Sequence, residues 1–244
     1  MSKRVLITGA TSGIGKSLAE LYAGRGYSVY ACGRNLEKLN ELAQHGGIEA
    51  LQFDQLNTSE VKSVLANLDP IDIAILNAGD CEYIDDALNF DADLFKRVID
   101  INLTSVGSLL QQILPQLNRE TDTAQLVLVG SSASMVPFTR AQAYGASKAG
   151  IAYLADSLYI DLQPHNIDVS LVLPGFIKTP LTDKNDFSMP FLMTSDEAAE
   201  RIYQGIEKRQ RHIAFPKRLI WSLRAAKCLP AKWWRKIMLN SDQN

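Results

Sequence analysis

Cysteine is scarce in this sequence and long apolar stretches are absent, and both absences exclude classes of protein. Only three cysteines occur among 244 residues, and they form neither a C-x-x-C pair nor a metal-ligand spacing. Isolated thiols argue against a disulfide framework and indicate a reducing compartment. The apolar run at residues 5–7 is too short for a signal-peptide core, and no run of about 18 apolar residues follows. We therefore expect a cytoplasmic protein without a metal site.

The charge is nearly balanced in total but unevenly distributed. The formal net charge is −2, and the hydrophobic fraction of 46% is that of an ordinary globular protein. Ten Lys and Arg residues and no acidic residue lie between positions 208 and 241, whereas all but one of the 27 acidic residues come earlier. The basic segment is a local feature that requires its own explanation.

Short apolar segments alternate with amphipathic segments along most of the chain. Strands are predicted over 5–8, 28–32, 49–53, 71–76, 125–129, 168–173 and 212–215, and helices over 13–25, 35–45, 58–68, 91–118, 142–163 and 195–209. Continuous apolar strands separated by helices are typical of a parallel sheet covered on both faces. The expected fold class is α/β: a single-domain Rossmann fold with a doubly wound parallel sheet over 1–215. A basic-aromatic helical extension is expected over 216–244.

A glycine-rich turn, TGATSGIG, joins the first predicted strand to the first predicted helix. Glycines allow a tight turn and the close approach of a pyrophosphate to the N–H groups of the helix N-terminus. An ordinary strand–helix turn also uses glycines, so the turn alone is a modest signal. A P-loop is excluded because that pattern requires glycine five residues before Gly15, where the chain has Ala10.

Three further motifs follow in order: Asn77-Ala78-Gly79 after the fourth strand, Tyr144-x-x-x-Lys148 on a helix, and a P-G-x-x-x-T segment over 174–179. Together with the glycine turn, these motifs resemble those of the short-chain dehydrogenase/reductase family. The resemblance covers about residues 4–215. It implies an oxidoreductase that acts on a CH–OH group with NAD(P) as acceptor.

Tyr144 and Lys148 stand four residues apart on a predicted helix and therefore share one face. A phenol with a pKa of about 10 is a poor acid/base at neutral pH, and a neighbouring ammonium lowers that pKa. Without the other motifs, such a pair would more often be a packed tyrosine and a solvated lysine. The resemblance assigns Tyr144 as general acid/base and Lys148 also to the nicotinamide ribose.

Two more residues complete the catalytic set that the resemblance implies. Ser131 lies 13 residues before Tyr144 at the end of the fifth strand, where it would hold and polarise a carbonyl oxygen; its neighbour Ser132 is the alternative. Asn102 matches an asparagine that bends its helix around a water, which relays protons between Lys148 and solvent. Asparagine inside a helix is otherwise a mild defect.

The end of the second strand favours NADP(H). NAD-preferring folds place a carboxylate there, and this chain has Gly33-Arg34, whose guanidinium suits a 2′-phosphate. The alternative is that Arg34 is merely exposed to solvent and that the cofactor is NAD(H). The resemblance assigns Asp54 to the adenine and Thr179 to the nicotinamide amide, although Thr179 also suits a helix start. The full expected cofactor set is Gly9, Thr11, Ser12, Gly13, Ile14, Gly15, Arg34, Asp54, Asn77, Ala78, Gly79, Tyr144, Lys148, Pro174, Gly175, Ile177 and Thr179.

The loop after the sixth strand is rich in apolar side chains, which favours a hydrophobic substrate, although any one of them would equally pack a lid. These side chains are Phe176, Leu181, Phe187, Met189, Phe191, Leu192 and Met193. Near this site, Arg140 is expected to face solvent, with contact to an anionic group as the alternative, and Cys81 to be a passive thiol at the pocket mouth.

The segment over 215–236 interleaves basic residues with tryptophan and leucine. Packing on the domain or on a second subunit, with lysines extending to solvent, is the first interpretation. Peripheral contact with the inner face of an anionic membrane is the second. Apart from its basic residues, which could also contact nucleic acid, nothing in the chain resembles a nucleic-acid-binding module. The resemblance also implies a homodimer or homotetramer formed through the helices that hold Asn102 and Tyr144.

The expected function is an NADP(H)-dependent carbonyl reductase or alcohol dehydrogenase. It would transfer hydride between nicotinamide and a hydrophobic, lipid-like aldehyde or ketone. An epimerase or dehydratase of the extended relatives is disfavoured, because few residues remain for a substrate domain. A non-catalytic NADP(H)-binding regulator is the alternative of a different class. The complete set of Asn102, Ser131, Tyr144 and Lys148 argues against it, since a regulator needs only the cofactor residues.

Overall fold

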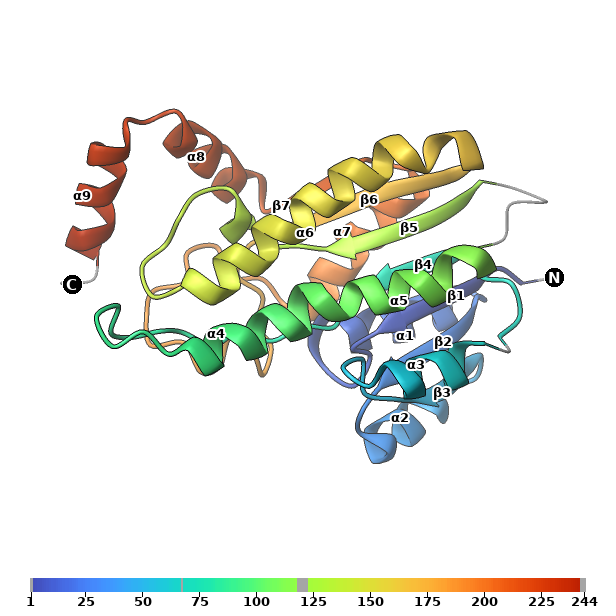
Figure 1. Cartoon of the computed structure of the whole chain (residues 1–244). Coiled ribbons are helices and arrows are strands. Elements are labelled where there is room, and N and C mark those ends of the chain that lie inside the picture. The colour runs from blue at the N-terminus through green and yellow to red at the C-terminus, as the bar shows by residue number, and fades with distance from the viewer. Residues whose placement is uncertain (1, 67, 118–122, 242–244) are drawn as a thin grey trace.

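The computed structural model describes residues 2–66, 68–117 and 123–241 (Figure 1). Within these residues, seven strands form one parallel sheet in the order β3-β2-β1-β4-β5-β6-β7. The strands are β1 Arg4–Thr8, β2 Ser28–Gly33, β3 Ile48–Gln52, β4 Ile73–Leu76, β5 Ala124–Val129, β6 Ile167–Pro174 and β7 His212–Phe215. The strand order reverses between β1 and β4, and ligands of such sheets bind at the carboxyl ends of the strands beside this reversal.

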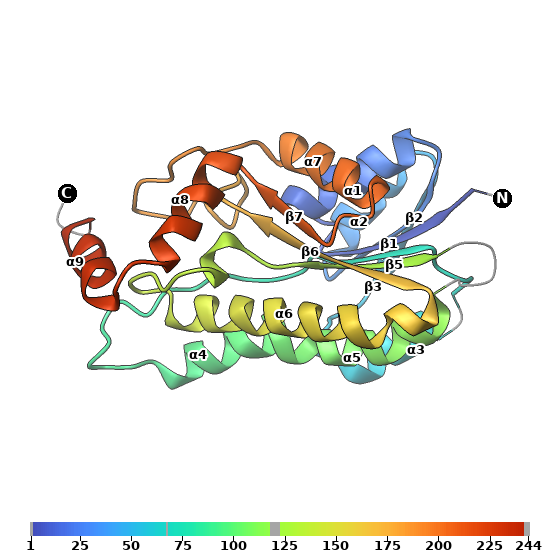
Figure 2. The ribbon, with the colours of Figure 1, turned by 90° about the horizontal axis from the view of Figure 1, so that it is seen from above.

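Helices cover both faces of the sheet (Figure 2). They are α1 Gly13–Gly24, α2 Leu36–Ala43, α3 Thr58–Leu65, α4 Ala92–Ile99, α5 Ser105–Ile113, α6 Gln142–Asp161, α7 Ser195–Glu207, α8 Lys217–Lys227 and α9 Ala231–Ser241. α1, α2 and α7 lie on one face, and α3 to α6 lie on the other. Leu18 and Ile202 are fully buried in the core on the first face, and Leu109 and Leu126 in the core on the second. Both faces of the strands are therefore apolar, as the sequence predicted.

Several helices begin at polar caps that the chain supplies locally. The side chains of Asn35, Asn57 and Asp91 accept backbone N–H groups at the starts of α2, α3 and α4. α7 begins with a capping box between Thr194 and Glu197. Such caps satisfy the N–H groups that a helix start leaves unpaired.

The predicted α/β fold is confirmed, and the segment predicted as one helix over 91–118 is helical from 92 to 116, but it is not α-helical throughout. A π-helical turn, Asp100–Thr104, separates α4 from α5, and residue 118 lies outside the described part of the chain. A π turn contains one residue more than an α-turn. The spacing of apolar residues along a sequence does not reveal such an insertion. Asn102 lies in this turn and makes its side-chain contacts outside the helix.

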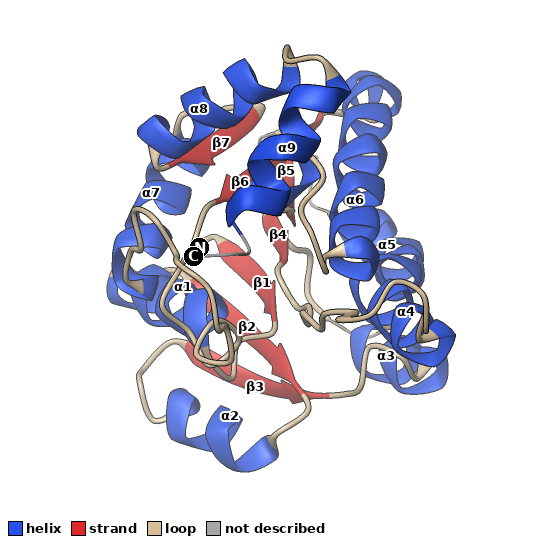
Figure 3. Cartoon of the chain, turned by 90° about the vertical axis from the view of Figure 1, so that its left-hand side faces the viewer, coloured by secondary structure: helices blue, strands red, loops and turns tan. Residues whose placement is uncertain are grey.

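α8 and α9 pack beyond the carboxyl ends of the strands. Figure 3 looks onto this edge and shows α9 in front of the sheet. Leu219 and Leu223 of α8 are buried, and the ring nitrogen of Trp234 on α9 donates a hydrogen bond to the carbonyl of Pro137 at 2.7 Å. Trp234 also meets Phe138 edge to face, with centroids 6.0 Å apart. One side of each helix therefore packs on the domain. None of the helices within the described residues has the length and apolarity to cross a bilayer.

Candidate active site

The glycine turn forms a cradle at the start of α1. Gly9 and Gly13 have left-handed backbones, with φ of 68° and 53°. A Cβ at Gly15 would lie 2.2 Å from the carbonyl oxygen of Gly9, so only glycine fits there. The side chain of Ser12 makes no capping hydrogen bond, in contrast to the side chains that cap α2, α3, α4 and α7. The first N–H groups of α1 are thus left for an anionic ligand, as a pyrophosphate requires.

A cavity of about 500 Å³, the glycine-turn cavity, opens above the carboxyl ends of β1 and β4. The predicted residues that line it are Gly9, Thr11, Ser12, Gly13, Ile14, Arg34, Asp54, Asn77, Ala78, Gly79 and Thr179. Gly15 lies beneath the turn, Pro174 is buried in β6, and Ile177 is buried in the core. The cavity is also lined by Gln55, Ile101 and Lys184, which were not predicted, and by Leu181, which was predicted only for the substrate side. The three unpredicted residues lie in loops after strands or in the π turn, and no motif marks them in the sequence.

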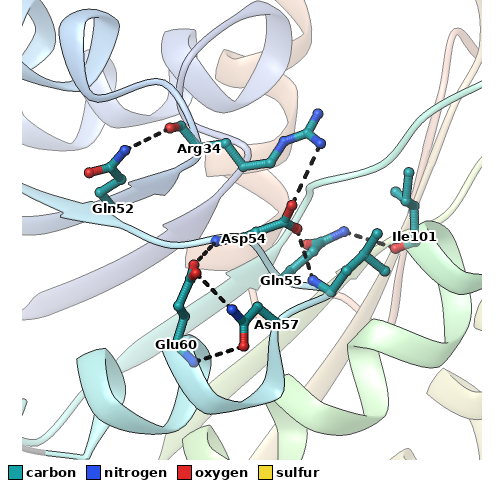
Figure 4. Close-up of polar contacts among 8 residues, drawn as sticks. Arg34, Gln52, Asp54, Gln55, Asn57, Glu60 and Ile101 are labelled. Atoms are coloured by element: carbon teal, nitrogen blue, oxygen red, sulfur yellow. Dashed lines mark hydrogen bonds and ion pairs between the residues drawn. The ribbon is translucent and has the colours of Figure 1, made fainter.

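Arg34 stands at one end of this cavity and remains 70% exposed in its side chain (Figure 4). Its guanidinium lies 3.9 Å from one carboxylate oxygen of Asp54. The other carboxylate oxygen accepts the backbone N–H of Leu56 at 2.9 Å, and the N–H of Asp54 donates to Glu60 at 2.9 Å. Asp54 is therefore fixed in the turn before α3, and one of its oxygens is already bonded locally.

Tyr144 lies on α6 at the boundary of a second cavity of about 420 Å³, the tyrosine cavity. Burial raises the pKa of the Tyr144 phenol above its ordinary value, the nearby Cys81 raises it further, and a hydrogen bond with the Ser131 side chain lowers it. Ser131 and Ser132 both line this cavity, and the Ser131 hydroxyl also accepts the N–H of Ala133 at 3.1 Å. The structure thus brings Ser131 and Tyr144 together, as the resemblance implied.

Lys148 is buried one turn further along α6. Its ammonium donates to the carbonyl of Val129 at 3.0 Å and lies 5.8 Å from the centre of the Tyr144 ring. Burial lowers the pKa of Lys148 to about 8. The lowering of the pKa of Tyr144 by Lys148 stays a prediction, because burial outweighs the other influences on the phenol in this arrangement. The ammonium bonds to a carbonyl of β5, and desolvation dominates the pKa of the phenol.

Asn102 connects the π turn to the loop after β4 and to α6. Its side-chain oxygen accepts the N–H of Asp80 at 2.8 Å, and its amide donates to the carbonyl of Asp80 at 2.8 Å and to the hydroxyl of Ser147 at 3.0 Å. A Cβ at Gly79 would lie 2.8 Å from the Asn102 oxygen. Asn102 therefore fixes the loop that follows Asn77-Ala78-Gly79 beside the helix that carries Tyr144.

The tyrosine cavity is lined mainly by apolar side chains from four separate segments. Of the residues predicted in the loop after β6, Phe176, Leu181 and Phe187 line it. Met189, Phe191, Leu192 and Met193 do not, and Met193 is buried in the core. The sequence analysis missed Tyr83, Phe138, Leu219, Leu223 and Met238. The last three come from α8 and α9, so the C-terminal segment forms part of the wall.

Arg140 was predicted to face solvent, but its guanidinium binds two carboxylates. Its Nε donates to Asp85 at 2.7 Å, and its Nη1 donates to Asp186 at 2.9 Å. The side chain lines the tyrosine cavity and is 34% exposed. Cys81 also lines this cavity, and burial raises the pKa of its thiol, which agrees with a passive thiol.

A glycine cradle beside a Ser–Tyr–Lys cluster, at the carboxyl edge of a doubly wound sheet, is the arrangement of a nucleotide-dependent oxidoreductase. The family model for short chain dehydrogenases matches residues 3–189. The chain therefore belongs to the short-chain dehydrogenase/reductase family.

Individual relatives agree with this assignment. An uncharacterized oxidoreductase of Myxococcus xanthus is 34% identical over 237 residues, which are 93% of each chain. Sulfoacetaldehyde reductase 2 of Chromohalobacter salexigens is 33% identical over 190 residues, which are 75% of each chain. Among solved structures, the short-chain dehydrogenase from Sphingobium yanoikuyae in complex with NADPH has a TM-score of 0.78 and 30% identity, with 87% of each chain covered. The protein is an oxidoreductase of a family whose members bind a nicotinamide cofactor.

Proposed function

We propose that the protein is an NADP(H)-dependent carbonyl reductase or alcohol dehydrogenase, acting on a hydrophobic aldehyde or ketone. The observation that carries the proposal is the placement of Tyr144 and Ser131 in an apolar cavity of about 420 Å³. Leu181 lines both this cavity and the glycine-turn cavity, so a substrate would lie beside a cofactor.

NADPH, when bound, supplies the hydride. Tyr144 gives its hydroxyl proton to the carbonyl oxygen, and the Ser131 hydroxyl donates to the same oxygen and stabilises the developing negative charge. The phenol of Tyr144, whose pKa burial raises, is protonated at neutral pH and so carries the proton that carbonyl reduction requires. Lys148 is the buried cation near the tyrosine, where it would hold the nicotinamide ribose and exchange protons with solvent through a water at the π turn of Asn102.

Two observations support a preference for NADP(H) over NAD(H). Arg34 is exposed at the end of the glycine-turn cavity, and β2 ends without a carboxylate at this point. A guanidinium makes charge-assisted hydrogen bonds with a 2′-phosphate. The Sphingobium structure, which this chain resembles over 87% of its length, holds NADPH.

The remaining parts of the proposal concern the assembly and its place in the cell. We propose a catalytic domain over 1–215, an extension over 216–244, a cytoplasmic location, and pairing of two or four copies through α4, α5 and α6. The outer side of the extension is proposed to make peripheral contact with an anionic membrane. Trp221 and Trp233 are 66% and 67% exposed there, which supports an interfacial role.

The test is NADPH consumption by the purified chain with aldehydes and ketones of increasing chain length. We expect kcat/KM to rise with chain length until the tyrosine cavity is filled. Tyr144→Phe is expected to lose about 10²- to 10⁴-fold in kcat, the usual contribution of a general acid, and to keep its affinity for NADPH. Tight NADPH binding without turnover of any carbonyl compound would instead favour the non-catalytic regulator.

A further inference from the structure

The tyrosine cavity contains a basic side chain whose charge is already neutralised. Arg140 is the only Lys or Arg among the described residues that line this cavity. Its backbone is left-handed, with φ of 61°, and its carbonyl accepts the N–H of Ile84 at 3.0 Å. The guanidinium is therefore held at the cavity boundary, directly before the helix that carries Tyr144.

The two carboxylates that bind Arg140 come from two different loops and lie behind the guanidinium, since neither aspartate itself lines the cavity. Asp85 lies in the loop after β4, and Asp186 lies in the loop after β6. The same two loops meet through Tyr83, whose hydroxyl donates to Asn185 at 3.1 Å and whose ring meets Phe187 with centroids 5.7 Å apart. Several contacts thus hold the carboxylates where they meet the guanidinium.

This cluster of Arg140, Asp85 and Asp186 carries one positive and two negative charges. An anionic group that entered the cavity would find the guanidinium engaged at both Nε and Nη1. To bind Arg140 at these atoms it would have to displace one carboxylate and would still face the other. At the separations of a small site, like charges repel appreciably even in partly aqueous surroundings.

The rest of the lining offers no compensating cation. Its polar groups include the hydroxyls of Thr139, Thr182 and Ser188 and the amide of Asn185. Lys148 is buried behind the cavity and bonds to the carbonyl of Val129. Hydroxyls and an amide suit a neutral polar group, whereas an acidic group would lose its hydration without gaining a charged partner.

We propose that the cluster of Arg140, Asp85 and Asp186 makes the enzyme selective for neutral carbonyl compounds and rejects acidic ones. This inference rests on the proposed function and specifies the substrate class of the same site. The two carboxylates are the specificity-determining residues, and Arg140 is a positioning residue that becomes an anion-binding residue once they are neutralised.

The experiment compares two aldehydes of nearly identical shape, methyl 4-formylbenzoate and the anion 4-formylbenzoate. Wild-type enzyme is expected to reduce the ester with at least about tenfold higher kcat/KM. In the double variant Asp85→Asn/Asp186→Asn, the ratio of carboxylate to ester kcat/KM is expected to rise by about 10- to 100-fold, the effect of one new charge-assisted hydrogen bond. The triple variant with Arg140→Gln added is expected to lose this gain.

Asp156→Asn/Asp168→Asn is the matched control. Each of these aspartates also binds an arginine, Arg211 and Arg209 respectively, but these arginines, unlike Arg140, line neither of the two cavities. The control keeps the wild-type ratio if the effect is local to the site. Equal wild-type kcat/KM values for the two aldehydes would overturn the proposal, as would an unchanged ratio in Asp85→Asn/Asp186→Asn. A gain that persists without Arg140 would overturn the assigned role of the arginine.

Calorimetric binding of both aldehydes to the NADP⁺-loaded protein provides a readout that does not depend on turnover. The rejection of acidic compounds, the charge rule, is supported if the wild-type protein binds the ester more tightly and Asp85→Asn/Asp186→Asn reduces or reverses this preference. This result would hold even if the aldehydes are not reduced. Absence of turnover with such binding would count against the proposed function alone. Tighter binding of the carboxylate to the wild-type protein would overturn the charge rule alone.

Discussion

The ammonium of Lys148 on α6 donates a hydrogen bond to the main-chain carbonyl of Val129 at the end of β5, at 3.0 Å. This bond holds a buried cation one helical turn along α6 from Tyr144. Burial disfavours the charged form, which is why the pKa of Lys148 falls to about 8. The position is therefore unfavourable for stability, as is common where a charged group serves a catalytic site.

Replacing this lysine is expected to affect stability in a pH-dependent way. The folded-state pKa of Lys148 is below its ordinary value of 10.5, so the folded protein bears a cost that is fully present below pH 8 and is lost as the pH rises toward 10.5. The gain in stability of Lys148→Met over wild type should therefore be larger at pH 7 than at pH 9.5. The difference between the two pH values should be about 2 kcal/mol in the free energy of unfolding.

Urea denaturation at pH 7 and pH 9.5 measures this difference directly. Lys62→Met, on the exposed side of α3, is the matched control and should show no such pH dependence. If the stability difference between Lys148→Met and wild type is the same at both pH values, the pKa of Lys148 is not lowered by burial. Loss of turnover in the folded Lys148→Met protein would separately support its role at the site.

Replacement of Arg34 should change the choice of cofactor. Arg34→Leu removes the guanidinium proposed to bind the 2′-phosphate but leaves the glycine cradle intact. We expect the KM for NADPH to rise by about 10- to 100-fold, the effect of a lost charge-assisted hydrogen bond, while the KM for NADH changes little. Steady-state kinetics with both cofactors provides the measurement. An equal rise for NADPH and NADH would mean that Arg34 supports the fold of the cavity and does not read the phosphate.

The outer side of α8 and α9 differs electrostatically from the rest of the surface. Its seven basic residues lie over residues 217–241, where the sequence has no acidic residue. The seven are Lys217, Arg218, Arg224, Lys227, Lys232, Arg235 and Lys236. Exposed Trp221, Trp233, Ile237 and Leu239 lie among them. Two copies of this face would repel one another, whereas an anionic bilayer accepts both the cations and the apolar side chains.

Tryptophan fluorescence can report on this face alone, because the only three tryptophans of the chain are Trp221, Trp233 and Trp234. Vesicles of phosphatidylcholine with phosphatidylglycerol should shift the emission to the blue, and vesicles of phosphatidylcholine alone should not. Lys232→Gln/Arg235→Gln/Lys236→Gln should weaken binding by on the order of 100-fold, because each substitution removes the attraction of one basic residue to the anionic surface.

The charge-matched control for the tail variant is Lys38→Gln/Lys62→Gln/Arg201→Gln, on the exposed sides of α2, α3 and α7. It should bind anionic vesicles as the wild type does. Equal weakening by both triple variants would show that net charge, and not this face, attracts the membrane. Absence of a blue shift would contradict membrane contact. Self-association lost in the tail variant, measured by ultracentrifugation, would assign the face to a second copy of the chain.

Local patterns in the sequence were sufficient for the fold and for the order of the site motifs. The apolar runs became the strands of the sheet, because a strand buried on both faces must be apolar throughout. Gly9, Gly13 and Gly15 were recognisable because a tight turn that leaves N–H groups open has few alternatives to glycine. Tyr144 and Lys148 share a helix face, which spacing alone determines.

Only the tertiary structure decided what surrounds these residues. The π turn at Asn102 depends on hydrogen bonds to Asp80 and Ser147, which are 22 and 45 residues distant in sequence. The partners of Arg140 come from loops 55 and 46 residues away, and Met238 reaches the tyrosine cavity from the far end of the chain. Burial likewise set the pKa values of Tyr144 and Lys148 against the simple expectation for a neighbouring pair. Desolvation and long-range contacts depend on which segments meet in space, and the periodicity of a sequence carries no record of that.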